Sequence, residues 1–256
     1  MKSVTTTTAT SLLFLALIQA AMCANNVTVD VATFFPQING NLTKIVWAHA
    51  VNNKTLLENA LKTADIMMLE ADVTIANNTT PIMAHPPENT SDLTLEEFLD
   101  KVITKNVTKG IKLDFKSIEA FNASKPILDK VRNNITFPVF LNADILAGPV
   151  NANATPVNAV SFLTEAKAYS EYTLSVGWTT RYEAKDNATE ARYTEKQIQE
   201  MIDILKKQNI TQPITYPLRA GLAVNDIKVL KSLMEKSSEM KNATLTTWST
   251  EGDTVD

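Results

Sequence analysis

Cysteine is nearly absent from this chain of 256 residues, in which Cys23 is the only one. A single cysteine can form no internal disulfide, so the fold must depend on an ordinary hydrophobic core, for which this length is sufficient. Runs of basic residues are also absent, and the net charge is −4. Mild acidity without a basic run argues against nucleic acid or an anionic membrane as the main partner.

Long apolar runs are absent after the N-terminus, so we expect no transmembrane segment. The one extended apolar stretch, LLFLALIQAA at 12–21, follows Lys2 and precedes the small residues Cys23 and Ala24. This pattern predicts a secretory signal peptide over residues 1–24, too short to span a bilayer. Residues 25–256 are then expected to form a single secreted domain.

Asn-x-Ser/Thr sequons are unusually frequent. They begin at Asn26, Asn41, Asn53, Asn77, Asn78, Asn89, Asn106, Asn122, Asn134, Asn153, Asn187, Asn209 and Asn242. One sequon arises easily by chance, but this density behind a signal peptide predicts a heavily glycosylated extracellular protein. Each used sequon must lie on the surface, because a glycan cannot be buried.

Expected strands and helices alternate along the chain. The strands are predicted at 45–49, 67–73, 110–115, 139–142, 173–178, 214–218 and 244–248, and the helices at about 55–64, 94–102, 118–131, 159–169, 194–205 and 225–236. Repeated βα units predict an α/β fold with a parallel sheet. Polar residues follow nearly every strand, which favours a TIM-type barrel over an open doubly wound sheet.

The strand count is one short of the eight that close a TIM barrel. Either residues 81–84 form a further barrel strand, or the sequence stops before a last helix and strand. We favour the second alternative, a C-terminally truncated barrel domain.

Acidic and basic residues alternate within two of the expected strands. Glu70 and Asp72 stand at i and i+2, and so do Lys112, Asp114 and Lys116 on the third strand. Residues at this spacing project from the same face of a strand, so all five should point into one cavity. Three carboxylates (Glu70, Asp72 and Asp114) without cysteine ligands suit Mg²⁺ or Ca²⁺. A lysine beside such an ion suits an oxyanion such as phosphate.

Histidine is scarce, with only two in the chain. His49 closes the first expected strand, and His85 lies in the loop after Asp72. Imidazole is the side chain best suited to proton transfer near neutral pH, so both are candidate catalytic residues. Further polar and aromatic residues at strand ends are candidates for substrate binding: Lys112, Asn142, Trp178, Arg219 and Trp248.

Motifs at nearly every expected strand resemble the menorin family of secreted or membrane-tethered proteins. They are WAHAVNN (47–53), MLEADV (68–73), PIMAHPPENTSDLTLEEFL (81–99), KGIKLDFKS (109–117), PVFLNADILAGP (138–149), LSVGWTTRY (174–182), TYPLRAGLA (215–223) and LTTWS (245–249). That family is similar in turn to the phospholipase-C-like phosphodiesterases, which include glycerophosphodiester phosphodiesterases and spider-venom sphingomyelinase D enzymes. Both resemblances imply a TIM barrel.

The resemblance to the phosphodiesterases also implies roles for the site residues. His49 and His85 would be the acid–base pair, and Lys116 would face the phosphate. The three carboxylates named above would hold Mg²⁺ or Ca²⁺ while a neighbouring hydroxyl attacks the phosphorus. Two positions depart from the pattern, because Ala50 stands where those enzymes usually have arginine and Pro86 where they usually have aspartate. These departures put the positioning of the phosphate in doubt.

Three interpretations follow from these residues. The first is a metal-dependent phosphodiesterase acting on a glycerophosphodiester or a lysophospholipid-like substrate. The second, which resemblance to the menorins implies, is a non-catalytic extracellular ligand or adhesion module that acts in a receptor complex. The third is a structural network, in which the inward charges only neutralise one another.

Overall fold

The computed structural model describes residues 28–105, 107–152, 154–181, 191–250 and 253. The predicted signal peptide and the sequons at Asn26, Asn106, Asn153 and Asn187 lie outside these residues. The strands are β1 (Trp47–Ala48), β2 (Met68–Ala76), β3 (Thr80–Met83), β4 (Gly110–Phe115), β5 (Val139–Ala147), β6 (Thr173–Thr179), β7 (Ile214–Arg219) and β8 (Thr244–Trp248). The helices of four or more residues are α2 (Val31–Phe34), α3 (Lys54–Lys62), α4 (Leu95–Lys105), α5 (Ile118–Val131), α6 (Ala159–Ala166), α7 (Glu195–Lys207), α8 (Ala220–Ala223) and α9 (Ile227–Lys236).

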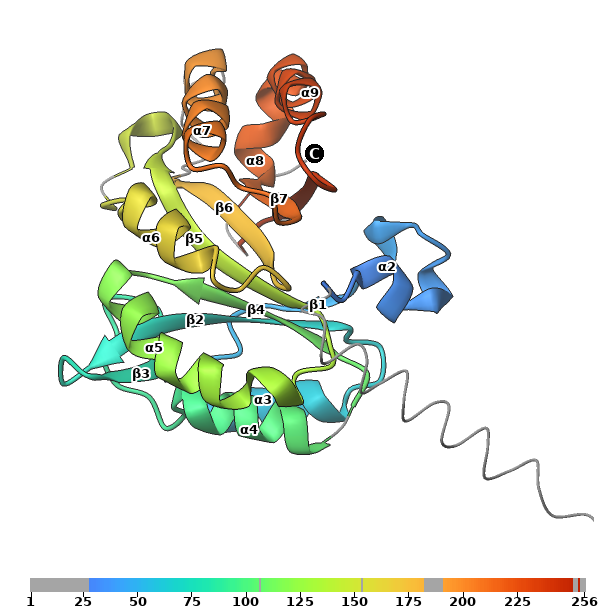
Figure 1. The fold of residues 1–256 in the computed structure, drawn as a ribbon, viewed down its shortest axis with the longest axis vertical. Coiled ribbons are helices and arrows are strands. Elements are labelled where there is room, and N and C mark those ends of the chain that lie inside the picture. The colour runs from blue at the N-terminus through green and yellow to red at the C-terminus, as the bar shows by residue number, and fades with distance from the viewer. Residues whose placement is uncertain (1–27, 106, 153, 182–190, 251–252, 254–256) are drawn as a thin grey trace, which may run out of the picture.

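Seven parallel strands form a curled sheet in the order β1-β2-β4-β5-β6-β7-β8. The longer helices lie outside this sheet, with α3, α4 and α5 on one side of the curl and α6, α7 and α9 on the other (Figure 1). The fold is a partial TIM-type barrel, as the alternation of strands and helices predicted. Among the described residues β1 and β8 each pair with one neighbour only, so the sheet is open between them.

The alternative that residues 81–84 form an extra barrel strand is wrong. Thr80–Met83 is a strand, but it folds back as β3 and pairs antiparallel with β2, from Ala76–Thr80 to Val73–Met83. The hairpin turn contains Asn77 and Asn78, which adopt positive φ angles of 50° and 61°. Asparagine tolerates this left-handed region better than most residues, which explains a turn at this point.

Strand alternation separates a hydrophobic layer from a polar interior. On β4, Ile111, Leu113 and Phe115 are fully buried in the core between sheet and helices. Phe115 packs on Phe121 of α5 with ring centroids 4.9 Å apart, and Phe121 packs at the same distance on Phe162 of α6. The intervening residues of β4 face the inside of the curl. The core thus lies outside the barrel sheet and leaves its inner face for polar side chains.

Two helices begin with a capping box. At the start of α4, Thr94 Oγ1 accepts from the Glu97 N–H at 3.2 Å, and Glu97 Oε2 accepts from the Thr94 N–H at 3.0 Å. Thr194 and Gln197 make the same reciprocal pair before α7. These bonds satisfy amide groups that a helix leaves unpaired in its first turn, and they fix where each helix begins.

The residues before β1 are more ordered than the sequence predicted. We expected a polar lead-in to about Asn41, but residues 31–44 form α2 and two short 3₁₀ helices. Phe35 and Ile38 are almost fully buried there, against Met67, Met68 and Phe140 at the N-terminal end of the sheet. This apolar stretch is too short to show a helical or strand period, so periodicity could not reveal it.

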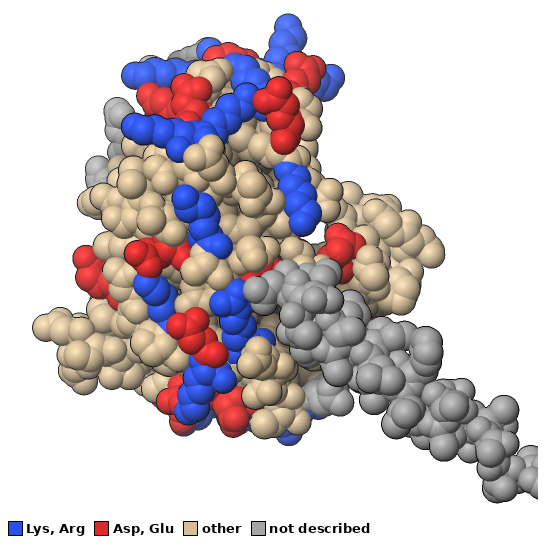
Figure 2. Space-filling model, in the orientation of Figure 1, with Lys and Arg blue, Asp and Glu red and all other residues tan. Residues whose placement is uncertain are grey.

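The described part of the surface carries mixed charge. On the face shown in Figure 2, basic and acidic side chains alternate without a continuous basic patch in the coloured region. Among the described residues no helix has the length and apolarity that crossing a membrane requires.

Candidate functional site

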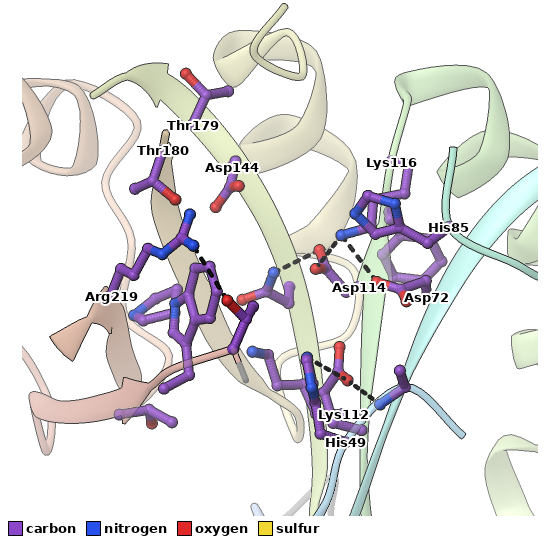
Figure 3. Close-up of a pocket in the computed structure, with 18 of the residues that line it drawn as sticks. His49, Asp72, His85, Lys112, Asp114, Lys116, Asp144, Thr179, Thr180 and Arg219 are labelled. Carbon is purple, nitrogen blue, oxygen red and sulfur yellow. Dashed lines mark hydrogen bonds and ion pairs between the residues drawn. The ribbon is translucent and has the colours of Figure 1, made fainter. Parts of the chain in front are cut away.

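A cavity of about 820 Å³ opens at the C-terminal ends of the parallel strands. Its wall contains residues from every strand of the parallel sheet, as Figure 3 shows for 18 of them. The charged and imidazole side chains that line it are His49, Glu70, Asp72, His85, Lys112, Asp114, Lys116, Asp144 and Arg219. The structure therefore brings nearly all of the predicted site residues to one place, whereas their roles stay predictions.

Three carboxylates meet in the cavity wall. Glu70 and Asp72 come from β2 and are 6% and 3% exposed, and Asp114 comes from the neighbouring β4. The parallel register places Asp72 directly beside Asp114. One oxygen from each of the three groups lies within 4.8 Å of the others. Like charges so close together require a cation or protons.

Lys116 supplies positive charge to two of these acids. Its Nζ lies 2.8 Å from Asp72 Oδ1 and 2.6 Å from Asp114 Oδ2. Burial alone would raise the pKa of Asp114, but the charges of Lys116 and Lys112 lower it to about 2. Burial likewise opposes the charge on Lys116, yet the two carboxylates raise the pKa of Lys116 well above its usual value. Asp114 and Lys116 are therefore both charged throughout the physiological pH range.

Amide side chains complete the bonding of the same carboxylates. Asn52 donates from Nδ2 to Asp72 Oδ2 at 2.7 Å and accepts the Asp72 N–H at 2.9 Å. Asn142 of β5 donates to Asp114 Oδ1 at 2.5 Å and accepts from Ser175 Oγ at 2.5 Å. A continuous chain of hydrogen bonds thus crosses four adjacent strands and fixes the orientation of the acids.

Glu70 has a different environment from the other two acids. Its Oε2 accepts the Ala50 N–H at 2.9 Å and lies 3.6 Å from His49 Nε2. Burial raises the pKa of Glu70; the charge of Lys112 opposes this, while Asp72 and Asp114 raise the pKa further. Ala50 adopts φ 54°, a rare conformation for a residue with a side chain, and this turn directs its amide at Glu70. A positive charge bound here would favour the ionised carboxylate.

Lys112 carries the second ammonium group of the cavity. Unlike Lys116, it is not paired with a carboxylate among the described residues. The residue is 7% exposed, and Figure 3 shows its side chain in the cavity near His49. No hydrogen bond or ion pair joins its Nζ to another described residue. A buried ammonium without a paired acceptor is costly, and an anion in the cavity would remove that cost.

The two histidines lie at the edge of the cavity. The His49 side chain is 57% exposed beside the buried Glu70. The His85 ring is exposed, and its Nδ1 lies 2.6 Å from the Pro86 carbonyl oxygen. A carbonyl only accepts, so this contact requires hydrogen on Nδ1 and leaves Nε2 of a neutral His85 as a proton acceptor.

Of the three predicted substrate-binding residues on the last strands, two line the cavity and one does not. Trp178 does not line the cavity, so its prediction is corrected: it is 1% exposed and packs on Tyr193, with ring centroids 5.4 Å apart. Alternation along β6 turns Trp178 toward the helices and Ser175 toward the interior. Arg219 and Trp248 line the cavity, with the guanidinium 5.2 Å from the indole centroid. Asp253 accepts two hydrogen bonds from Arg219, at 2.8 and 2.6 Å.

Asp144 is a cavity residue that was not among the predicted site residues. It stands two positions after Asn142 on β5, and its carboxylate points into the cavity (Figure 3). Burial and then the charge of Asp114 raise the pKa of Asp144 to about 7. The signal was present in the sequence, because Asn142 and Asp144 repeat the i, i+2 spacing of Glu70 and Asp72.

The geometry of the three acids is compatible with a divalent cation. Two oxygens on opposite sides of Ca²⁺ are about 5 Å apart, so oxygens within 4.8 Å of one another can share one ion. Oxygen-only ligands suit Ca²⁺ or Mg²⁺ rather than zinc. Lys116 already pairs with two of the acids, however, so an ion here would share them with an ammonium group.

Comparisons with known proteins identify the family. Residues 41–256 match the family described as the Menorin N-terminal domain. Human Protein FAM151B is 38% identical over 215 residues, which cover 82% of this chain and 74% of that protein. A GH18 chitinase, ChiB, from Flavobacterium johnsoniae aligns with a TM-score of 0.34 at 10% identity, over 80% of this chain and 86% of the chitinase. No conclusion about fold or function follows from a TM-score that low. The family match, covering most of the chain, and the human relative show that this chain belongs to the menorin family.

Proposed function

We propose that this protein is an extracellular phosphodiesterase of the menorin family that uses Mg²⁺ or Ca²⁺ held by Glu70, Asp72 and Asp114. The observation that carries the proposal is the convergence of these three carboxylates within 4.8 Å, in a cavity that both histidines line. Secretion is part of the proposal. It is supported by eight of the nine described sequon asparagines being exposed, with Asn53 half-buried.

The positive groups of the cavity are suited to hold a phosphodiester. Lys112 Nζ is buried without a described partner, so an anionic phosphate oxygen would satisfy it. Lys116, between Asp72 and Asp114, would add positive charge on the other side of the carboxylate cluster. A bound divalent ion would supply further charge neutralisation as the phosphorus is attacked. Substrates of the glycerophosphodiester or lysophospholipid type fit this chemistry.

The histidines differ in a way that suits acid–base catalysis. In His85, the Pro86 carbonyl keeps hydrogen on Nδ1, so Nε2 is available to take a proton from an attacking hydroxyl. In His49, Nε2 lies 3.6 Å from Glu70 Oε2, and a proton carried on this nitrogen can pass to the leaving oxygen. One proton is taken and one is given, so a second proton transfer must restore both rings before the next turnover.

Turnover on a panel of phosphodiesters is the direct test. We expect product release from glycerophosphodiesters or lysophospholipids with Mg²⁺ or Ca²⁺, and its loss in a Glu70→Gln protein, which keeps the side-chain shape. Calorimetric titration of the divalent ion into both proteins measures binding separately. Absence of turnover on every panel member, with ion binding intact, would refute catalysis but not the metal site.

A second candidate function is a non-catalytic extracellular ligand or adhesion module that acts in a receptor complex. The observation that favours it is the Lys116 ammonium, which pairs with both Asp72 and Asp114, at 2.8 and 2.6 Å, and offsets part of their charge. Ala50 and Pro86, which replace residues usual in phosphodiesterases, point the same way. A His49→Ala/His85→Ala protein that stays folded but loses biological activity would contradict this candidate.

A further inference from the structure

The Asp144 carboxylate is the cavity group that the proposed function leaves unused. It points into the cavity from β5, and no hydrogen bond or ion pair joins it to another described residue. Glycine at position 177 makes room for it, because a Cβ there would lie 2.6 Å from Asp144 Oδ1 and 2.8 Å from Pro217 Cγ. Asp144 is therefore held against the wall of β6 with its oxygens open to whatever occupies the cavity.

The charge balance of the cavity leaves a place for one positive group. Four carboxylates, on Glu70, Asp72, Asp114 and Asp144, face the ammonium groups of Lys112 and Lys116, while Arg219 is paired with Asp253. When all four carboxylates are ionised, the described lining has an excess of two negative charges. A divalent cation would cancel that excess, and a phosphodiester would then add one negative charge. A positive charge on the same ligand would restore neutrality.

The position of Asp144 indicates where that positive charge would lie. Asn142 is the register partner of Asp114, and Asp144 is two residues further along the same strand. Two residues of a parallel strand advance about 6.6 Å, so Asp144 lies above the acidic cluster toward the cavity mouth. A group attached to the phosphorus through a short alkyl chain could span this distance.

We infer that the Asp144 end of the cavity is a binding subsite for an alkylammonium group. That this ammonium group belongs to a phosphodiester rests on the proposed function. Under that function, the ligand is a zwitterionic phosphodiester that carries an amine on one of its ester arms. A neutral hydroxyl-bearing arm would leave the Asp144 charge uncompensated, so it should bind more weakly than an ammonium arm of the same size.

The test compares two diesters that differ in one group: methyl 2-aminoethyl phosphate and methyl 2-hydroxyethyl phosphate. Their affinities are measured by calorimetry with saturating Ca²⁺ or Mg²⁺ on the full chain. We expect the ammonium compound to bind wild type at least tenfold more tightly. Asp144→Asn, which keeps the side-chain shape, should equalise the two compounds and leave the affinity for dimethyl phosphate unchanged. Asp100→Asn, on the exposed side of α4, is the matched control and should behave as wild type.

A phosphate-free probe separates this inference from the proposed function. Ethylammonium binding is followed by NMR in wild type and in Asp144→Asn, and we expect weak binding that only wild type shows. If ethylammonium binds through Asp144 while no diester binds, the amine subsite stands and the phosphodiesterase proposal fails. If the diesters bind wild type equally, or Asp144→Asn keeps the preference, the amine subsite is refuted. If no probe binds, both are refuted.

Discussion

Replacing Lys116 by methionine tests how the acidic cluster is neutralised. The Lys116 side chain is 18% exposed, and its partners Asp72 and Asp114 are 5% and 14% exposed. Methionine keeps most of the side-chain volume but leaves both carboxylates without their ammonium partner. Removing one member of a buried ion pair usually costs about 3–5 kcal/mol, because the remaining charge stays buried and unpaired. We expect a loss of unfolding free energy of that size in the presence of a chelator.

Lys112 provides a matched control on the same face of the same strand. It is as long as Lys116 and more deeply buried, but its Nζ has no described partner. Replacing it with methionine removes the desolvation cost of the ammonium and loses only its longer-range attraction to Glu70 and Asp114. These effects oppose one another, so we expect Lys112→Met to change stability by less than about 1 kcal/mol.

Urea unfolding followed by fluorescence of the three tryptophans measures both variants. The expected result is a lower midpoint for Lys116→Met at an unchanged slope. Added Ca²⁺ should then stabilise Lys116→Met more than wild type, because no ammonium group competes for the carboxylates. A ligand present at 100 times its dissociation constant adds about 2.7 kcal/mol to the free energy of unfolding. Equal midpoints for the two lysine variants would refute the ion-pair argument. If Ca²⁺ and Mg²⁺ stabilise neither protein, the metal site is refuted and the structural network remains.

Three further substitutions test the cavity wall and the base of the barrel. Asp144→Asn removes a carboxyl whose pKa rises from 3.8 to about 7 on folding, so wild type loses stability as pH rises through this range. Urea midpoints should show the variant more stable by up to about 4 kcal/mol above pH 7 and unchanged near pH 3, whereas a pH-independent difference would contradict the shift. Gly177→Ala places a Cβ 2.6 Å from Asp144 Oδ1 and should cost about 1–3 kcal/mol in thermal unfolding; no loss would mean that the carboxylate moves freely. Phe35→Ala should cost about 3–5 kcal/mol because its ring is fully buried, and an unaltered midpoint would show that residues 31–44 do not support the barrel.

The alternating pattern of the sequence was sufficient to predict the seven parallel strands, because each is a short run of strand-forming residues and the first six are each followed by a helical period. It did not predict the β3 hairpin. Residues 77–80 contain two overlapping sequons, and the asparagines were interpreted as glycan sites rather than as the turn residues that they also are. The N-terminal 3₁₀ helices were missed for a related reason, since Phe35 and Ile38 give no period to detect.

The inward direction of the site residues could also be predicted, because charge marks one face of β2 and of β4. The error at Trp178 occurred on β6, where no charged residue marks either face. Which lysine pairs with which acid was beyond sequence reasoning. That pairing depends on the strand register, which sets Asp72 beside Asp114. It also depends on the length of the Lys116 side chain, which extends back to both carboxylates.

The positions of the two lysines on β4 explain why one fold can serve either candidate function. Lys116, which directly follows the last residue of β4, is held between two acids and offsets part of their charge. Lys112, two positions before Asp114, lies deeper and is the register partner of Glu70, where its charge opposes the effect of burial on the pKa. The carboxylate with a raised pKa and the ammonium without a described partner are therefore neighbours at the bottom of the cavity, where β2 and β4 pair. A structural network would gain from closing that contact into an ion pair, as it does at Lys116. The open arrangement is what a site that exchanges ions and anions requires, and it is the feature of this cavity that packing alone does not explain.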